Sequence, residues 1–146
     1  MLEVSSLVRK AFYQALNGNL TFNSAPVPVS DDIKPVGNTS PIWVVLGSQT
    51  SSPKNTFNGW ASDETIDLDI VYKTSTSSGK LQLDLIAGQI LGIIWPTITT
   101  NGLPAQTGVQ FLNVILSANR YIQLSLNSSN TVERRILTFK LYVAQL

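Results

Sequence analysis

Residues 64–73 read Glu-Thr-Ile-Asp-Leu-Asp-Ile-Val-Tyr-Lys and form the most regular stretch of the chain. In an extended strand, Leu68 and Ile70 lie on one side, whereas Asp67 and Asp69 lie on the other. This alternation with a period of two predicts a β-strand with one face on the hydrophobic core. Two acids are costly to bury without partners, so we expect their face to meet water or basic groups. We take this strand as the centre of a sheet.

The composition of the 146 residues limits the classes of protein to which the chain can belong. Hydrophobic residues make up 43% and charged residues 13%, whereas a typical domain is roughly 25% charged. The net charge of +1 argues against a dedicated nucleic-acid binder, in which lysine and arginine gather on one face. The length fits a single domain spanning residues 1–146. A nearly neutral, polar surface fits a protein that works inside an assembly.

The sequence offers little for catalysis, because it contains no cysteine and no histidine. Disulfides, metal sites built on these residues and catalytic triads that use them are therefore excluded. Asp67 and Asp69 are close together on one strand face, but a two-carboxylate hydrolase needs its acids on either side of a cleft. Gly88 and Gly92 are not followed by the Lys-Ser/Thr of a phosphate-binding loop. We expect no enzyme activity, no cofactor and no metal.

Two segments have the residue spacing of helices. In residues 4–16 apolar side chains recur at intervals of three and four, and Gly18 is a good end signal. Residues 81–94 continue such a spacing until Pro96, because the residue before a proline avoids the helical region.

The second predicted helix contains two glycines and a long apolar run. Gly88 and Gly92 would each cost about 1 kcal/mol relative to alanine, so we expect them to face the sheet in close packing. The near-apolar run of residues 85–95 falls short of the ~20 residues of a membrane span. No membrane association is expected.

The first half of the chain predicts two long strands and two loops. Residues 19–40 are rich in proline and indicate a surface connection with one short edge strand near residues 20–22. Residues 41–47 are rich in β-branched and aromatic side chains, which predicts a buried strand. Residues 48–59 turn polar and indicate a long hairpin loop. Residues 60–74 then form the central strand, antiparallel to the one before.

The last third of the chain alternates again. Residues 109–116 and 120–126 are strand segments, broken or bulged at residues 117–119. A turn at 127–130 leads to a last strand over 134–144. The predicted fold is therefore α+β, with a mainly antiparallel four-stranded sheet, two helices packed on one face, and the order α-β-β-α-β-β.

Two helices can cover only one side of such a sheet. The other side would carry charged and apolar side chains in alternation, which is typical of a protein interface. Trp60, beside the predicted hairpin loop, is a further possible contact. The candidate interface residues are Asp67, Asp69, Val71, Arg134, Ile136, Lys140, Tyr142 and Trp60.

The three tryptophans, Trp43, Trp60 and Trp95, leave an alternative open. Together they could build an aromatic platform for a sugar, as in a carbohydrate-binding module. We favour a core position for Trp43 and a helix-closing position for Trp95.

The pattern resembles the tail-terminator (tail-completion) proteins of long-tailed bacteriophages over nearly the whole chain. The matching features, in order, are the N-terminal helix ending near Ala15-Leu16, the strand at 41–47, the alternating strand at 65–73, the helix leading to Ile94, and the closing strand at 134–139.

This resemblance implies a structural virion protein of the tail or neck, assembled in the cytoplasm of the bacterial host. Its subunits would form a ring, usually a hexamer, that caps the tail tube and joins it to the head connector. The implied partners are further copies of the chain, the tail-tube protein and the head-connector or stopper protein. DNA would pass through the ring without sequence-specific binding. A tail-tube subunit or another neck subunit is the alternative within the virion.

Overall fold

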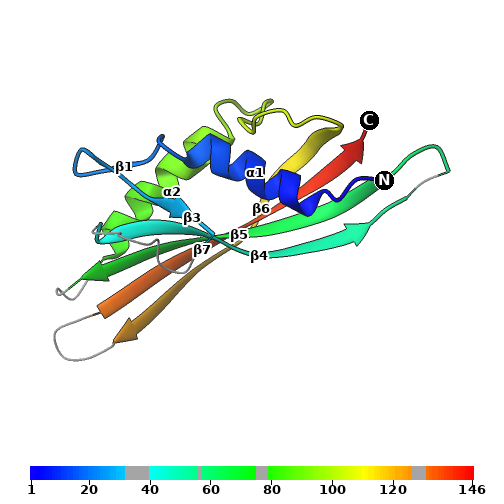
Figure 1. Cartoon of the computed structure of the whole chain (residues 1–146). Helices are drawn as coiled ribbons and strands as arrows, with labels where there is room; N and C mark the ends of the chain where they lie inside the picture. Colours follow the sequence, from blue (N-terminus) through cyan, green and yellow to red (C-terminus); the bar gives the residue numbers. More distant parts are fainter. Residues whose placement is uncertain (32–39, 56, 75–78, 126–130) are drawn as a thin grey trace.

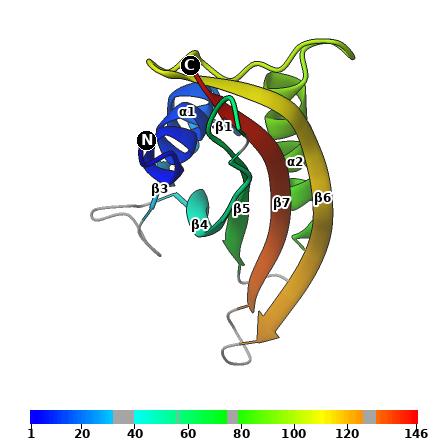
Figure 2. The same ribbon diagram turned by 90° about the vertical axis from the view of Figure 1, so that its right-hand side faces the viewer.

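The computed structural model describes residues 1–31, 40–55, 57–74, 79–125 and 131–146. Within these residues the elements are α1 (Ser5–Leu16), β1 (Thr21–Phe22), β2 (Ala25–Pro26), β3 (Val29–Ser30), β4 (Ile42–Pro53), β5 (Ala61–Thr74), α2 (Lys80–Ile94), β6 (Val109–Ser125) and β7 (Thr131–Gln145). The described part of the chain forms a five-stranded sheet in the order β3-β4-β5-β7-β6 and a separate two-stranded pair of β1 and β2. Both helices lie on the same face of the large sheet (Figures 1 and 2).

The predicted four-stranded antiparallel sheet and its order α-β-β-α-β-β are wrong. Short strands lie between α1 and β4, and β3 runs parallel to β4, which makes the large sheet mixed. The pairing is brief: Val29 is opposite Val44, and the Val44 N–H donates to the Pro28 carbonyl at 2.9 Å. A proline lacks an N–H but keeps its carbonyl, so it can still accept at a sheet edge. Two-residue strands leave no periodic pattern in the sequence.

The central position predicted for residues 64–73 is confirmed. They belong to β5, which lies between β4 and β7. Ile66, Leu68 and Ile70 are fully buried in the main core, whereas Asp67 and Asp69 are on the opposite face. The alternation in the sequence therefore divides the sheet into a helix-covered face and an outer face.

The helices meet the sheet around one aromatic residue of β7. The ring of Phe139 lies 5.4 Å from that of Phe12 of α1 and 5.6 Å from that of Trp95, which follows α2.

The predicted N-terminal helix is confirmed, and Gly18 beyond its end has a φ of +79°, a conformation that glycine adopts at little cost.

The predicted packing of Gly88 and Gly92 against the sheet is wrong. Both are exposed, and a Cβ added at either would have no atom within 4 Å. The sheet-facing positions of α2 include Ile86 and Ile90. Each glycine comes two residues after one of these isoleucines, which is about 200° around a helix. The glycines therefore lie on the outer side.

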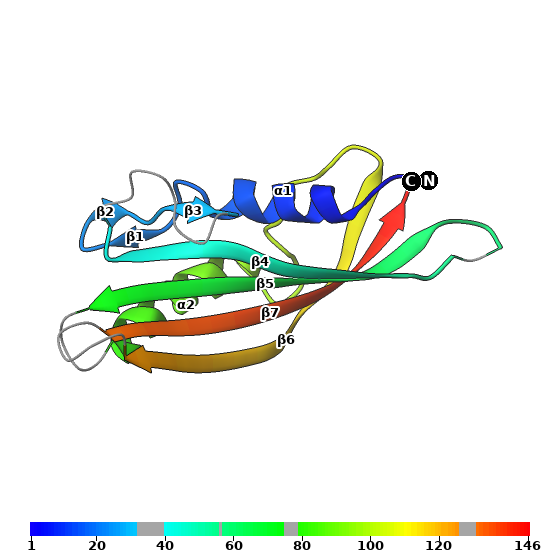
Figure 3. The same ribbon diagram turned by 60° about the horizontal axis from the view of Figure 1, so that its bottom comes forward.

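The predicted loop at 48–59 is wrong in its first half. β4 continues to Pro53 and pairs with β5 up to the pair Pro53–Ser62. We call the distal part of this hairpin, residues 51–55 and 57–64, the arm, and its end beyond the pair Pro53–Ser62 projects past the helices and the rest of the sheet (Figures 1 and 3). This polar segment forms a strand because β5 already begins at Ala61, so residues 49–53 of β4 pair with residues 62–66 of β5.

Glu64 is fully buried where the arm begins. Its Oε1 accepts hydrogen bonds from Ser51 at 2.6 Å and from Ser62 at 2.8 Å, and its Oε2 accepts one from Ser5 at 3.4 Å. Ionised acceptors make stronger hydrogen bonds than neutral ones, which offsets the burial of the charge. Glu64 thus ties the arm to the beginning of α1.

β6 is one strand, with register shifts at Leu112/Ile115 and at Leu116/Ala118. The second shift confirms the bulge predicted at residues 117–119. The turn predicted at 127–130 lies outside the described residues.

Candidate subunit interfaces

The outer face of the sheet brings most of the predicted interface residues together. Asp69 is opposite Ile136, and Val71 is opposite Arg134, across β5 and β7. The two apolar members of the set, Val71 and Ile136, are buried. Lys140 is exposed and Tyr142 half-buried at the same strand parity, nearer to the arm.

The acids of this face have partners within their own chain. Nε of Arg134 lies 3.0 Å and 3.2 Å from the two carboxylate oxygens of Asp69, and a second guanidinium nitrogen also donates to Asp69. The hydrogen bond to Asp69 raises the pKa of the Arg134 guanidinium above its ordinary value. Thr138 Oγ1 donates to Asp67 at 2.6 Å. The acids are therefore satisfied before any second copy approaches.

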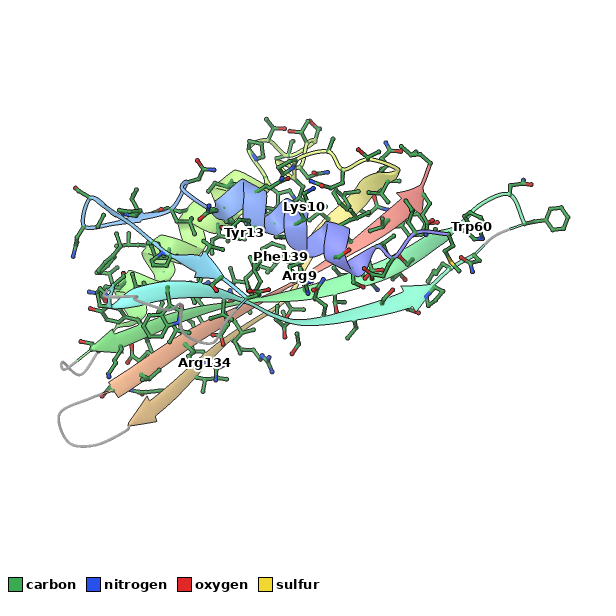
Figure 4. The ribbon with its side chains drawn as sticks, viewed as in Figure 1. Arg9, Lys10, Tyr13, Trp60, Arg134 and Phe139 are labelled. Carbon is green, nitrogen blue, oxygen red and sulfur yellow. The ribbon has the colours of Figure 1, made fainter. Side chains whose placement is uncertain are left out.

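Arg135 lies on the other side of the sheet from Arg134. It donates to Asp84 of α2 at 2.6 Å, and its guanidinium lies 5.0 Å from the centre of the Tyr121 ring. It therefore holds α2 to β6 and β7, and it does not share the outer face. Figure 4 shows Arg134 on the side of the sheet away from α1.

A second apolar cluster lies on the outer face, apart from the main core. It contains Trp43, Val45 and Val71, with Val132 packed against them. Beside it is a hollow of about 320 Å³, which we call the outer hollow, lined by this cluster and by Asp69 and Arg134. The sequence placed Trp43 in the core because residues 41–47 are apolar on both faces of their strand.

The three tryptophans do not form a platform. Trp43 is in the outer-face cluster, and Trp95 packs on Phe139 and donates its indole N–H to the Val114 carbonyl at 3.1 Å. Trp60 lies at the arm, at the opposite end of the sheet from Arg134 (Figure 4). The sugar platform considered from the sequence is therefore absent in this arrangement.

The end of the molecule that bears the arm exposes several large apolar side chains. Phe57 at the tip is fully exposed and Trp60 is half exposed. They line a hollow of about 420 Å³ together with Leu146. Both chain termini lie at this end (Figures 1 and 3), and the Leu2 N–H donates to Gln145 at 2.8 Å. The sequence analysis missed Phe57, whose only signal is a lone aromatic residue in a polar turn.

A shallow groove of about 470 Å³ runs beside α1. Arg9, Lys10 and Tyr13 face outward along the helix (Figure 4), and Arg9 donates to Gln49 of β4 at 3.2 Å. The groove is lined by charged, polar and apolar side chains together, which is a composition found in many protein contact surfaces. Its lining residues are Ser6, Arg9, Lys10, Tyr13, Val29, Ser30, Asp31 and Leu46.

The described residues contain no group of three or more histidine, cysteine, aspartate or glutamate side chains that could hold a metal ion. In the same part of the chain, no helix has the length and apolar character to cross a membrane. The buried acids support the fold: Glu133 accepts hydrogen bonds from the Gly79 N–H and from Gln123.

No known protein family and no curated protein matches this sequence. Among solved structures, a chain described as "Virion of native gene transfer agent (GTA) particle" matches with a TM-score of 0.74. The match covers 99% of this chain and 99% of that chain, at 14% sequence identity. At this identity the match establishes a shared fold, and the protein has the same fold as that chain of the virion.

Proposed function

We propose that this chain is a structural protein of a phage-like virion. The observation that carries the proposal is the shared fold with a chain of a gene transfer agent virion, which extends over 99% of both chains. Within the virion, the sequence resemblance favours a tail terminator, or tail-completion subunit.

In this role the chain forms a ring, with a hexamer as the expected size, at the end of the tail tube. One rim of the ring contacts the tail-tube protein, and the other contacts the head-connector or stopper protein. DNA passes through the ring without sequence-specific contacts, which agrees with a net charge of +1. The proposal gives the chain a role in virion assembly and no catalytic role.

The geometry supports contacts between unlike surfaces of neighbouring copies. The outer sheet face carries apolar side chains among the charges, and the arm exposes aromatic residues at the other end of the molecule. Contacts between two different surfaces repeat from copy to copy, and they close into a ring when the rotation between copies permits.

Electron microscopy of the purified protein tests the terminator against a tail-tube subunit. A terminator yields discrete rings that do not lengthen as the protein concentration rises, because its function is to stop growth. A tail-tube subunit yields stacked rings or tubes whose length increases with concentration. Monomers at all concentrations would contradict both roles.

A further inference from the structure

The arm is a paired hairpin that carries one fully exposed aromatic side chain. Its strands stay paired up to Pro53 and Ser62, and beyond that pair the Lys54 N–H donates to the Ala61 carbonyl at 2.7 Å. Lys54 also forms an ion pair with Asp63 at 3.0 Å. A paired stem loses less conformational freedom on binding than an unpaired loop would. Phe57 lies beyond this stem and is fully exposed to solvent.

The outer hollow has the properties of a receptor for such a side chain. Its volume of about 320 Å³ is at the lower end of the roughly 300–1,000 Å³ of ligand pockets, which suits one aromatic side chain. Trp43 and Val71 are among its apolar lining residues, and Arg134 also lines it. Guanidinium groups are attracted to aromatic faces. Aromatic anchors in such hollows supply most of the energy of many interfaces.

Arg134, which lines the hollow, and Trp60 of the arm lie at opposite ends of the same sheet (Figure 4). The arm is paired along its length and points away from the hollow of its own chain, so it cannot fill that hollow itself. No charge opposes a contact between copies, because Phe57, Asn58 and Gly59 are uncharged and the charges of Asp69 and Arg134 are paired.

We propose that Phe57 at the tip of the arm of one copy inserts into the outer hollow of a neighbouring copy. This inference rests on the proposed self-assembly and names the contact that joins successive copies. The contact is heterologous, because each copy offers its tip to one neighbour and its hollow to the other. It also explains why a fully exposed phenylalanine is held on a projecting hairpin.

Disulfide trapping tests this contact without background, because the chain has no cysteine. The double variant Asn58→Cys/Val132→Cys keeps Phe57; it is oxidised after assembly and run on a non-reducing gel. The expected result is a ladder of covalent oligomers, with a disulfide between positions 58 and 132 found by peptide mapping. Each single variant should stay mostly uncrosslinked, and a mixture of the two single variants should give dimers. Ile98→Cys/Val132→Cys is the matched control, because Ile98 is fully exposed on another loop.

A second variant keeps the inference testable if the cysteines disturb the hollow. Phe57→Ala should give the same circular dichroism spectrum as the parent, because Phe57 is fully exposed and the core is untouched. Its self-association constant should fall at least roughly tenfold, as expected for an aromatic anchor, whereas Ile98→Ala should assemble as the parent does. Rings that form without a 58–132 disulfide, and equally well in Phe57→Ala, would overturn the contact and leave the ring standing. A parent protein that remains monomeric would overturn both.

Discussion

The guanidinium of Arg134 binds the carboxylate of Asp69 across the two central strands of the same chain, with Nε 3.0 Å from one oxygen. The side chain of Asp69 is 14% exposed and that of Arg134 is 33% exposed. The ion pair is therefore part of the outer sheet face, and it leaves the apolar side chains of that face available to a second copy.

Removing this acid should destabilise the subunit itself. We expect Asp69→Asn to lower the free energy of unfolding by about 1–2 kcal/mol, because it leaves a half-buried guanidinium without its charged acceptor. Asp67→Asn should cost less, because an amide oxygen can still accept from Thr138. Urea unfolding at one protein concentration measures both variants. Equal effects of the two substitutions would contradict the special role of the ion pair.

Lys140 gives a test of the interface that spares the fold. It is exposed on the outer face, so Lys140→Glu should leave the circular dichroism spectrum unchanged. If this face contacts a neighbour, the charge reversal should weaken assembly a few-fold, with a marked dependence on salt. Lys80→Glu, at the exposed start of α2, is the control. Unchanged sedimentation of Lys140→Glu at low salt would place the interface elsewhere.

The glycines of α2 should be replaceable with a gain in stability. Alanine at Gly88 or Gly92 meets no neighbouring atom and removes the entropic cost of glycine in a helix interior. Each substitution should raise the free energy of unfolding by about 0.5–1 kcal/mol. A loss of stability in either variant, measured by thermal melting, would show that a Cβ is not tolerated there.

Glu3 should stabilise α1 in a pH-dependent way. Its carboxylate accepts hydrogen bonds from the N–H groups of Ser6 at 3.0 Å and Ser5 at 2.8 Å. These bonds lower the pKa of Glu3 below its ordinary value, and the bond from the Ser6 N–H has the largest effect. A lowered pKa means that the contribution is complete above the glutamate value of about 4.3 and is lost as the pH falls below it.

The variant Glu3→Gln isolates this contribution. It should be less stable than the parent near neutral pH by less than about 1 kcal/mol, because the group is exposed and screened. The difference should shrink as the pH is lowered below 4.3. A difference that stays constant down to pH 3 would assign the effect to something other than the charge.

The sequence predicted those parts of the fold that repeat over many residues. The alternation of β5 and the three-and-four spacing of α1 reflect burial on one face, and both predictions are confirmed. The strand β3 could not be predicted, because it has only two residues and is too short to show an alternation of apolar and polar side chains. The outer half of β4 was taken for a loop because it is polar, and its strand conformation depends on β5, which is distant along the chain.

The candidate site was predictable where it follows from strand parity. Parity placed Asp69, Val71 and Arg134 on one face, and the structure confirms that arrangement. Strand parity does not predict which side chains form hydrogen bonds with one another. The bonds of Asp69 with Arg134 and of Asp67 with Thr138 were therefore missed. The place of Trp43 was also missed, because an apolar run gives no sign of which of its side chains face the helices.

The central claim is that this chain assembles into a closed ring, and its mass in solution tests that claim most directly. Multi-angle light scattering after size exclusion should give one species with several times the 15.9 kDa of a single chain, unchanged over a wide range of loading concentrations. A hexamer is the expected size. A species of 15.9 kDa at the highest concentration and at virion-like salt would contradict the account, and so would a mass that rises with concentration without a limit.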